Sequence, residues 1–235
     1  MKKIFGLLAG ILLTFPVFAQ QPDTLKHGAG KGYEMNTVFG NHKEHRHVPL
    51  GYFVELNAGY TRFDSKDVFL PGIQAGIILD HHWTLGAAGS FVGNSGNLYF
   101  KDIYYNENDA QWHGAHLSGG YGGFLFEYTL LPRSVVHISF PLLIGGGYMY
   151  FQDHPPHPDS LFNPHEYPDH HSHVISGDHF FVIEPGVKVE FNIVKHLRLG
   201  LGISYRYTPD LDLSGVSADL INQFTGRLTL RFGKF

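Results

Sequence analysis

From residue 50 onward, apolar and polar side chains alternate one by one along the chain. In the stretch 197–207 every odd position is Leu, Ile or Tyr, and every even position is Arg, Gly or Ser. A period of two is typical of a β-strand with one apolar face. The stretches 181–193 and 223–232 follow the same pattern, which therefore predicts β-structure toward the end of the chain.

The polar faces of these strands distinguish a membrane barrel from a soluble sandwich. They mix glycine with charges of both signs, whereas a face turned to water more often carries Lys, Glu and Thr with little Gly. Such a mixture is typical of a narrow barrel lumen, and aromatic residues near the strand ends fit a membrane interface. The inward parity predicts one set of charged lumen side chains: Glu55, Glu184, Lys188, Glu190, Arg198, Arg206, Arg227 and Arg231.

Eight segments carry this alternation, at roughly 50–62, 69–80, 83–94, 112–130, 133–152, 178–193, 196–208 and 220–235. The links near 80–83, 130–134 and 193–196 are short, and those near 62–69, 94–112, 152–178 and 208–220 are longer. Short turns on one side and long loops on the other are the pattern of outer-membrane barrels, whose long loops face outside the cell. The prediction is an all-β fold: an eight-stranded antiparallel up-and-down transmembrane β-barrel with short periplasmic turns and long extracellular loops.

Two positions break the regular alternation. In the fourth segment Leu117 and Tyr121 share one parity, while Phe124 and Phe126 share the other. The glycines between them predict a β-bulge. At the end of the chain Phe235 is out of phase with the apolar face, so either a bulge falls near residue 233 or this ring does not face lipid.

The first residues have the order of a secretory signal. Lys2 and Lys3 precede an apolar run at 4–15, and Pro16 and a small-residue site ending at Ala19 follow. We expect a signal peptide at 1–19, a polar and irregular periplasmic tail at 20–49, and an outer-membrane barrel at 50–235.

Composition supports a membrane barrel and excludes some chemistry. Charged residues make up 16% of the chain, below the roughly 25% usual in soluble domains. With no cysteine, disulfides, thiolate metal sites and cysteine nucleophiles are excluded. A formal charge of −4 argues against nucleic acid as a partner, since that needs a basic face.

Five stretches carry a resemblance to a known protein family: "NTVFG", "GGYGGFLFEYTLLPRSVVHISFPLLIGGG", "FFVIEPGVKVEFNI", "LRLGLGISYRYT" and "LTLRFGKF". Together they span most of residues 36–235, and the chain resembles a family of small outer-membrane β-barrel proteins of Bacteroidota-type Gram-negative bacteria. The resemblance implies a barrel fold and a location in the cell outer membrane. It implies no reaction, because the family has no established activity.

The segment 154–173, "HPPHPDSLFNPHEYPDHHSH", is rich in histidine and proline and belongs to the predicted extracellular loop 152–178. Neutral imidazole suits Zn, Cu and Ni, and carboxylates can complete a ligand shell. The candidate ligands are His170, His171, His173 and Asp169, joined by His154, His157, His179, His113 and His116. The alternative is a polar, proline-rich loop that binds no metal, because no spacing such as HExxH fixes these ligands on one face.

Two further groups have structural and functional interpretations. The lumen charges predict an ion-pair network that fills a narrow eight-stranded barrel; the alternative is an ion pathway. His137 and Ser139 share a strand face, as a hydrolase pair would. No acid is assigned to orient them, which favours lumen packing.

The sequence favours a structural, adhesive or loop-display protein over an enzyme, with no required cofactor. Outer-membrane lipid and an extracellular ligand held by the loops are the expected partners, and no oligomeric state is predicted. The alternative function is binding or acquisition of Zn, Cu or Ni through the histidine-rich loop. A lipid-modifying hydrolase ranks below both.

Overall fold

The computed structural model describes residues 33–37, 40–44, 50–93, 95–106, 110–153, 173–209 and 211–235. The predicted signal peptide lies outside these residues, and so does the histidine-rich segment up to residue 172. None of the helices in the described part of the chain has the length and apolarity to cross a membrane.

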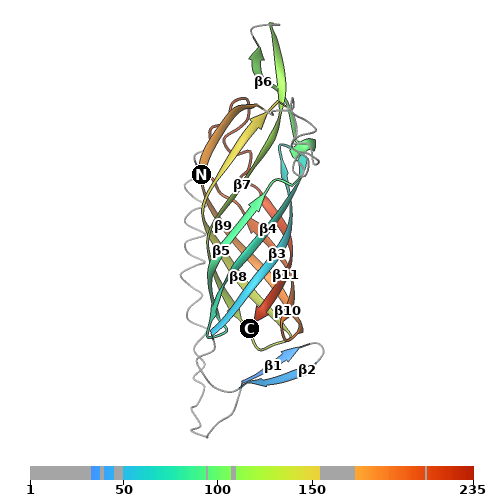
Figure 1. Ribbon diagram of the computed structural model, residues 1–235, viewed down its shortest axis with the longest axis vertical. Helices are drawn as coiled ribbons and strands as arrows, with labels where there is room; N and C mark the ends of the chain where they lie inside the picture. Colours follow the sequence, from blue (N-terminus) through green and yellow to red (C-terminus); the bar gives the residue numbers. More distant parts are fainter. Residues whose placement is uncertain are drawn as a thin grey trace, which may run out of the picture. The chain divides into compact units, whose positions relative to one another are not determined.

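Eight antiparallel strands pair in a closed ring (Figure 1). In ring order they are β3 (Leu50–Phe63), β4 (Lys66–Leu79), β5 (Trp83–Phe91), β7 (Gln111–Leu130), β8 (Val136–Gln152), β9 (Val174–Val194), β10 (Leu197–Tyr205) and β11 (Phe224–Lys234). The ring closes where β11 pairs with β3, from Gly226 opposite Tyr60 to Lys234 opposite Tyr52. The predicted eight-stranded up-and-down barrel is confirmed.

The barrel exterior is apolar. Along β3 the residues facing the lumen are buried, while Tyr52, Leu56 and Tyr60 are about half exposed or more. The exposed aliphatic side chains lie mainly between the strand ends: Leu56, Ile73, Leu85, Ile138, Val187, Leu201, Ile203 and Leu228. Aromatic side chains flank them at the end with the short turns (Tyr52, Trp83) and at the opposite end (Tyr60, Tyr205, Phe224). This apolar belt with aromatic borders is the surface of a transmembrane barrel, which confirms the expected membrane location.

One predicted loop is a tight turn. The link expected to be long at 62–69 is the two-residue turn Asp64–Ser65 between β3 and β4. Both residues have positive φ angles, 44° and 67°, as the central residues of a type I′ hairpin turn do. Asp64 is among the residues favoured in such turns, but Ser65 stands where glycine or asparagine is usual, so the sequence carries only part of the usual sign.

The structure also contains strands that the sequence did not predict. The link 94–112 holds η2 (Ser95–Asn97) and β6 (Tyr99–Asn106), which pairs with the first part of β7. This β6–β7 hairpin projects beyond the ring (Figure 1). The tail expected to be irregular contains a second hairpin, β1 (Tyr33–Thr37) with β2 (Gly40–Glu44).

The two irregularities expected from the sequence are resolved without a bulge. The register of β7 with β8 is unbroken from His116 to Leu130, so Leu117 and Tyr121 point into the lumen and Phe124 and Phe126 point out. The expected bulge in this strand was wrong, because the lumen itself is apolar at the level of Leu117. Phe235 is also inward and buried.

Candidate functional site

The lumen contains a layer of buried charges nearer the short turns, which we call the ionic layer. All eight predicted lumen residues lie in it, on β3, β9, β10 and β11 or directly after β10. The structure adds Glu127 of β7, which is 1% exposed. The layer therefore has four carboxylates and five cations: Glu55, Glu127, Glu184, Glu190, Lys188, Arg198, Arg206, Arg227 and Arg231.

Arg231 and Lys188 form the centre of the ionic layer. Arg231 donates from Nη1 and Nη2 to the two oxygens of Glu127, at 2.7 and 3.0 Å, and from Nε to Glu55 at 2.6 Å. Lys188 Nζ lies 3.1 Å from Glu55, 3.0 Å from Glu127 and 3.0 Å from Glu190. A two-pronged arginine–carboxylate contact fixes orientation as well as charge, so these groups hold four strands in one register.

Glu184 organises the part of the ionic layer farther from the short turns. It accepts from Ser204 at 2.5 Å and from Arg227 at 2.5 Å, and Arg206 Nε lies 3.6 Å away. Arg227 also donates to the Tyr121 hydroxyl at 2.8 Å. Arg206 lies over the Tyr121 ring, 4.6 Å from its centroid, so Tyr121 joins this layer to the next.

The end of the lumen nearer the short turns is lined by aromatic rings under two arginines. Arg198 lies 3.7 Å from the centroid of the Phe235 ring, and Arg231 lies 4.2 Å from that of Phe53. Phe53 and Phe235 pack with Ile78 and Leu125 in a small apolar cluster. A cation over an aromatic face is stabilised by the ring quadrupole, which explains why Phe235 turns inward.

Above the ionic layer, toward the long loops, the lumen is filled by what we call the apolar core. Strand residues such as Leu117, Phe151 and Val182 form part of it. The rest comes from the links between strands, with Val92 and Leu98 from one link and Leu211, Leu213, Leu220 and Ile221 from another. A cavity of about 50 Å³ lies below, lined by residues including Glu55, Lys188, Glu184 and Arg227. By volume it can hold one or two water molecules.

His137 and Ser139 lie in the ionic layer, and both contact one carboxylate. His137 Nε2 is 3.0 Å from Glu190 Oε2, and the Ser139 hydroxyl donates to the same oxygen at 3.2 Å. Ser139 Oγ is also 3.0 Å from Thr129 Oγ1. In a hydrolase triad the histidine takes the proton of the serine; here the acid stands between the two, an arrangement typical of a packed network.

The predicted metal ligands are only partly within the described residues. His154, His157, Asp169, His170 and His171 lie outside them. Within the described ranges no three His, Cys, Asp or Glu side chains come together as a metal site would require. Binding of Zn or another divalent metal by this loop stays a prediction.

The four predicted ligand histidines that lie within the described residues have other contacts. His113 stacks on Tyr104, His116 packs on Tyr99 and His179 packs on Tyr148, with ring centroids 5.4, 5.2 and 4.5 Å apart. The backbone N–H of His173 donates to Asp153 Oδ1 at 2.9 Å.

Two functional features were missed from the sequence. Glu127 shares inward parity with Leu125 and Thr129 and alternates with the outward Phe126, so the signal for it was present in the sequence. The β6–β7 hairpin carries three cross-strand aromatic pairs; besides those of His113 and His116, the Tyr105 and Trp112 centroids are 5.7 Å apart. The run of rings in "YFKDIYY" was the available signal for this second feature.

No family model matches the chain, and no curated protein matches it. Several solved structures are similar in fold at low identity, among them three bacterial proteins. Neisserial surface protein A is 12% identical, over 79% of this chain and 97% of that chain, with a TM-score of 0.48. The outer membrane protein OprG from Pseudomonas aeruginosa is 10% identical, over 78% and 95%, at 0.43. Ail of Yersinia pestis, in complex with the heparin analogue sucrose octasulfate, is 13% identical, over 78% and 96%, at 0.39. Membership of a Bacteroidota-type family stays a prediction.

Proposed function

We propose that this chain is an outer-membrane β-barrel with a closed lumen, which acts by displaying its extracellular loops and the β6–β7 hairpin to ligands outside the cell. The observation that carries the proposal is the combination of a filled lumen with a projecting hairpin rich in exposed aromatic side chains. A structural or adhesive role follows, because the interior is occupied by the protein itself.

The filled lumen supports display over transport. The ionic layer pairs charges from β3, β7, β9 and β11 across the barrel, and the apolar core lies between it and the long loops. An ion crossing this interior would have to break buried ion pairs and then enter an apolar region, and both steps are costly. We therefore expect purified protein in planar bilayers to show no steady conductance; channel steps of constant size would contradict the closed lumen.

The orientation can be tested with single cysteines, because the chain has none of its own. Lys101 is exposed on β6, and Arg133 is exposed in the short turn after β7. A membrane-impermeant maleimide on intact cells should label Lys101→Cys and leave Arg133→Cys unlabelled. Permeabilising the outer membrane should expose both. The reverse order, or labelling of both positions only after permeabilisation, would overturn display outside the cell.

A further inference from the structure

One face of the β6–β7 hairpin carries a row of rings, which we call the aromatic strip: the exposed Tyr99, Tyr105 and Trp112, and the half-buried His116. Tyr99, Tyr105 and Trp112 are 44%, 49% and 61% exposed. Tyr105 pairs with Trp112 and Tyr99 with His116 across the two strands. Gly114 lies between Trp112 and His116, and a Cβ there would clash with the Tyr99 hydroxyl oxygen, so the end of the Tyr99 side chain lies against the bare backbone of β7.

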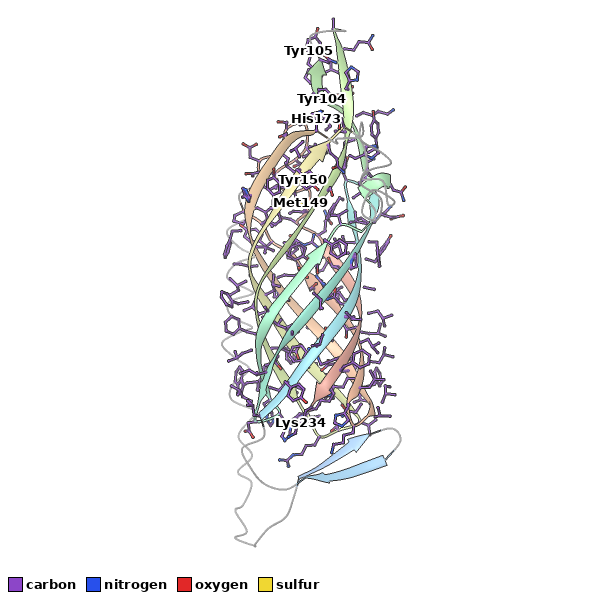
Figure 2. The ribbon with its side chains drawn as sticks, viewed as in Figure 1. Tyr104, Tyr105, Met149, Tyr150, His173 and Lys234 are labelled. Atoms are coloured by element: carbon purple, nitrogen blue, oxygen red, sulfur yellow. The ribbon has the colours of Figure 1, made fainter. Side chains whose placement is uncertain are left out.

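The aromatic strip continues the lipid-facing exterior of the barrel. Trp112 and His116 have the same parity on β7 as Phe124 and Phe126, which face out from the ring. The β7–β8 register is unbroken between His116 and these rings. Figure 2 shows Tyr105 near the tip of the hairpin and Tyr150 of β8 closer to the ring. A molecule held in the outer leaflet beside β7 can therefore reach the strip without leaving the barrel surface.

Directly below the strip the exterior is hollowed where glycines face outward. Gly120 and Gly122 of β7 and Gly146 of β8 line a shallow groove of about 620 Å³, bordered by Tyr148 and His179. Gly122 is the cross-strand neighbour of Gly146, and Gly120 that of Tyr148. The groove lies in the apolar exterior, so a lipid chain is the molecule that meets it.

The residue types of the strip differ from those of the belt. The belt exposes mainly Leu, Ile, Val and Phe, whereas the exposed large side chains of the hairpin are Tyr and Trp. These rings combine an electron-rich face with a polar O–H or N–H. A sugar ring is complementary to them, with C–H groups on its face and hydroxyls at its edge. The sequence 99–116 has one basic residue, Lys101, against Asp102, Glu107 and Asp109, which disfavours a ligand recognised through phosphate or sulfate.

We propose that the barrel binds a glycolipid of the outer leaflet, with sugar rings stacked on the aromatic strip and an acyl chain in the glycine groove. The inference rests on the proposed function, since it needs the hairpin to lie outside the cell. We assign the glycolipid to the outer leaflet because the strip and the groove follow one another along β7 on one surface. Binding would hold the hairpin against the sugar layer that surrounds the barrel.

The two tryptophans allow a direct test. Trp83 lies at the end of the barrel with the short turns, so the Trp83→Phe protein reports on Trp112 alone. Acrylamide quenching would be measured in a detergent without sugar headgroups, with added lipopolysaccharide that carries core sugars, with lipid A lacking them, or with phospholipid. We expect core sugars alone to lower the quenching constant about twofold, because they cover a ring that is 61% exposed by face-to-face stacking.

Matched variants separate the two parts of the site. Tyr105→Ser should weaken the apparent affinity about fivefold by removing one stacking ring, while Tyr104→Ser, on the opposite face of the same strand, should leave it unchanged. Gly146→Leu should weaken binding, because Gly146 lines the groove and the larger side chain would fill it. Equal quenching in all three lipids would overturn the proposal. Protection by lipid A equal to that by lipopolysaccharide with core sugars would also overturn it, because Trp112 would then be anchored at the membrane interface without contact to sugars. Maleimide labelling of Lys101→Cys on intact cells shows whether a failure lies instead in the orientation.

Discussion

The ionic layer and the apolar core fill one lumen with opposite chemistry. The ionic layer is built from strand residues such as Glu55, Lys188 and Arg231, whose positions the closed ring of hydrogen bonds fixes. The apolar core takes much of its material from links, with Leu211, Leu213 and Ile221 packed against strand residues. Strands can present charges in fixed pairs, whereas a loop that folds inward is retained mainly by burying apolar surface. In this lumen the ion pairs therefore lie on strands, and links that fold inward complete the apolar core.

The difference has an energetic consequence. A buried ion pair gains little over well-packed apolar groups, but loss of one partner leaves a charge without compensation. An apolar core loses stability in proportion to the cavity that a truncation leaves. Substitutions in the ionic layer should thus depend on which partner remains, and substitutions in the apolar core should depend on volume.

The largest effect is expected at Arg231. Replacement by Met leaves Glu55, Glu127 and Glu190 to share Lys188, and should lower the free energy of unfolding by about 3–5 kcal/mol, the cost of an unpaired buried charge. Urea unfolding in lipid vesicles measures it. The double variant R231M/E127Q should recover part of the loss, because one of the unpaired carboxylates becomes neutral. Additive losses in the double variant would show that the two side chains do not act as a pair.

A smaller loss is expected in the apolar core. Leu117→Ala removes a fully buried side chain and should cost about 3 kcal/mol by transfer and cavity terms. Hydrogen exchange should quicken in the link 211–221, which packs in the same cluster, and remain slow in β9 and β11 at the ionic layer. Faster exchange throughout the barrel would mean that the two layers unfold as one unit.

The alternation of apolar and polar residues was enough to predict most of the fold and most of the ionic layer from the sequence. Alternation identified the strands and eight inward charges, because a β-strand turns every second side chain to the same face. The same rule failed at Leu117 and Tyr121, since apolar side chains were expected to face lipid while here they face an apolar lumen. Glu127, the two-pronged partner of Arg231, was missed although it alternates with the outward Phe126.

Local turn chemistry and tertiary contacts account for the remaining differences. The turn at Asp64 and Ser65 adopts positive φ angles without the glycine or asparagine that marks such turns. Phe235 keeps the inward parity of Arg231, and an apolar ring is accommodated there because it packs under Arg198, a contact between strands that no local pattern encodes. Which histidines approach one another is likewise set by strand register, and His113, His116 and His179 each meet a tyrosine.

Tyr121 belongs to both the ionic layer and the apolar core. Its ring packs in the apolar core, while its hydroxyl accepts from Arg227 at 2.8 Å. Tyr121→Phe keeps the ring under Arg206 and removes the hydroxyl, and should cost about 1.5–2 kcal/mol, as for a hydrogen bond to a charged group. Tyr121→Leu also removes the ring, so its cost in urea unfolding should exceed that of Tyr121→Phe. If the two variants lose the same stability, the ring contributes nothing measurable at this boundary, and the hydroxyl alone joins the layers. If Tyr121→Phe is as stable as the wild type, the layers are joined by packing, and the contact with Arg227 is energetically neutral.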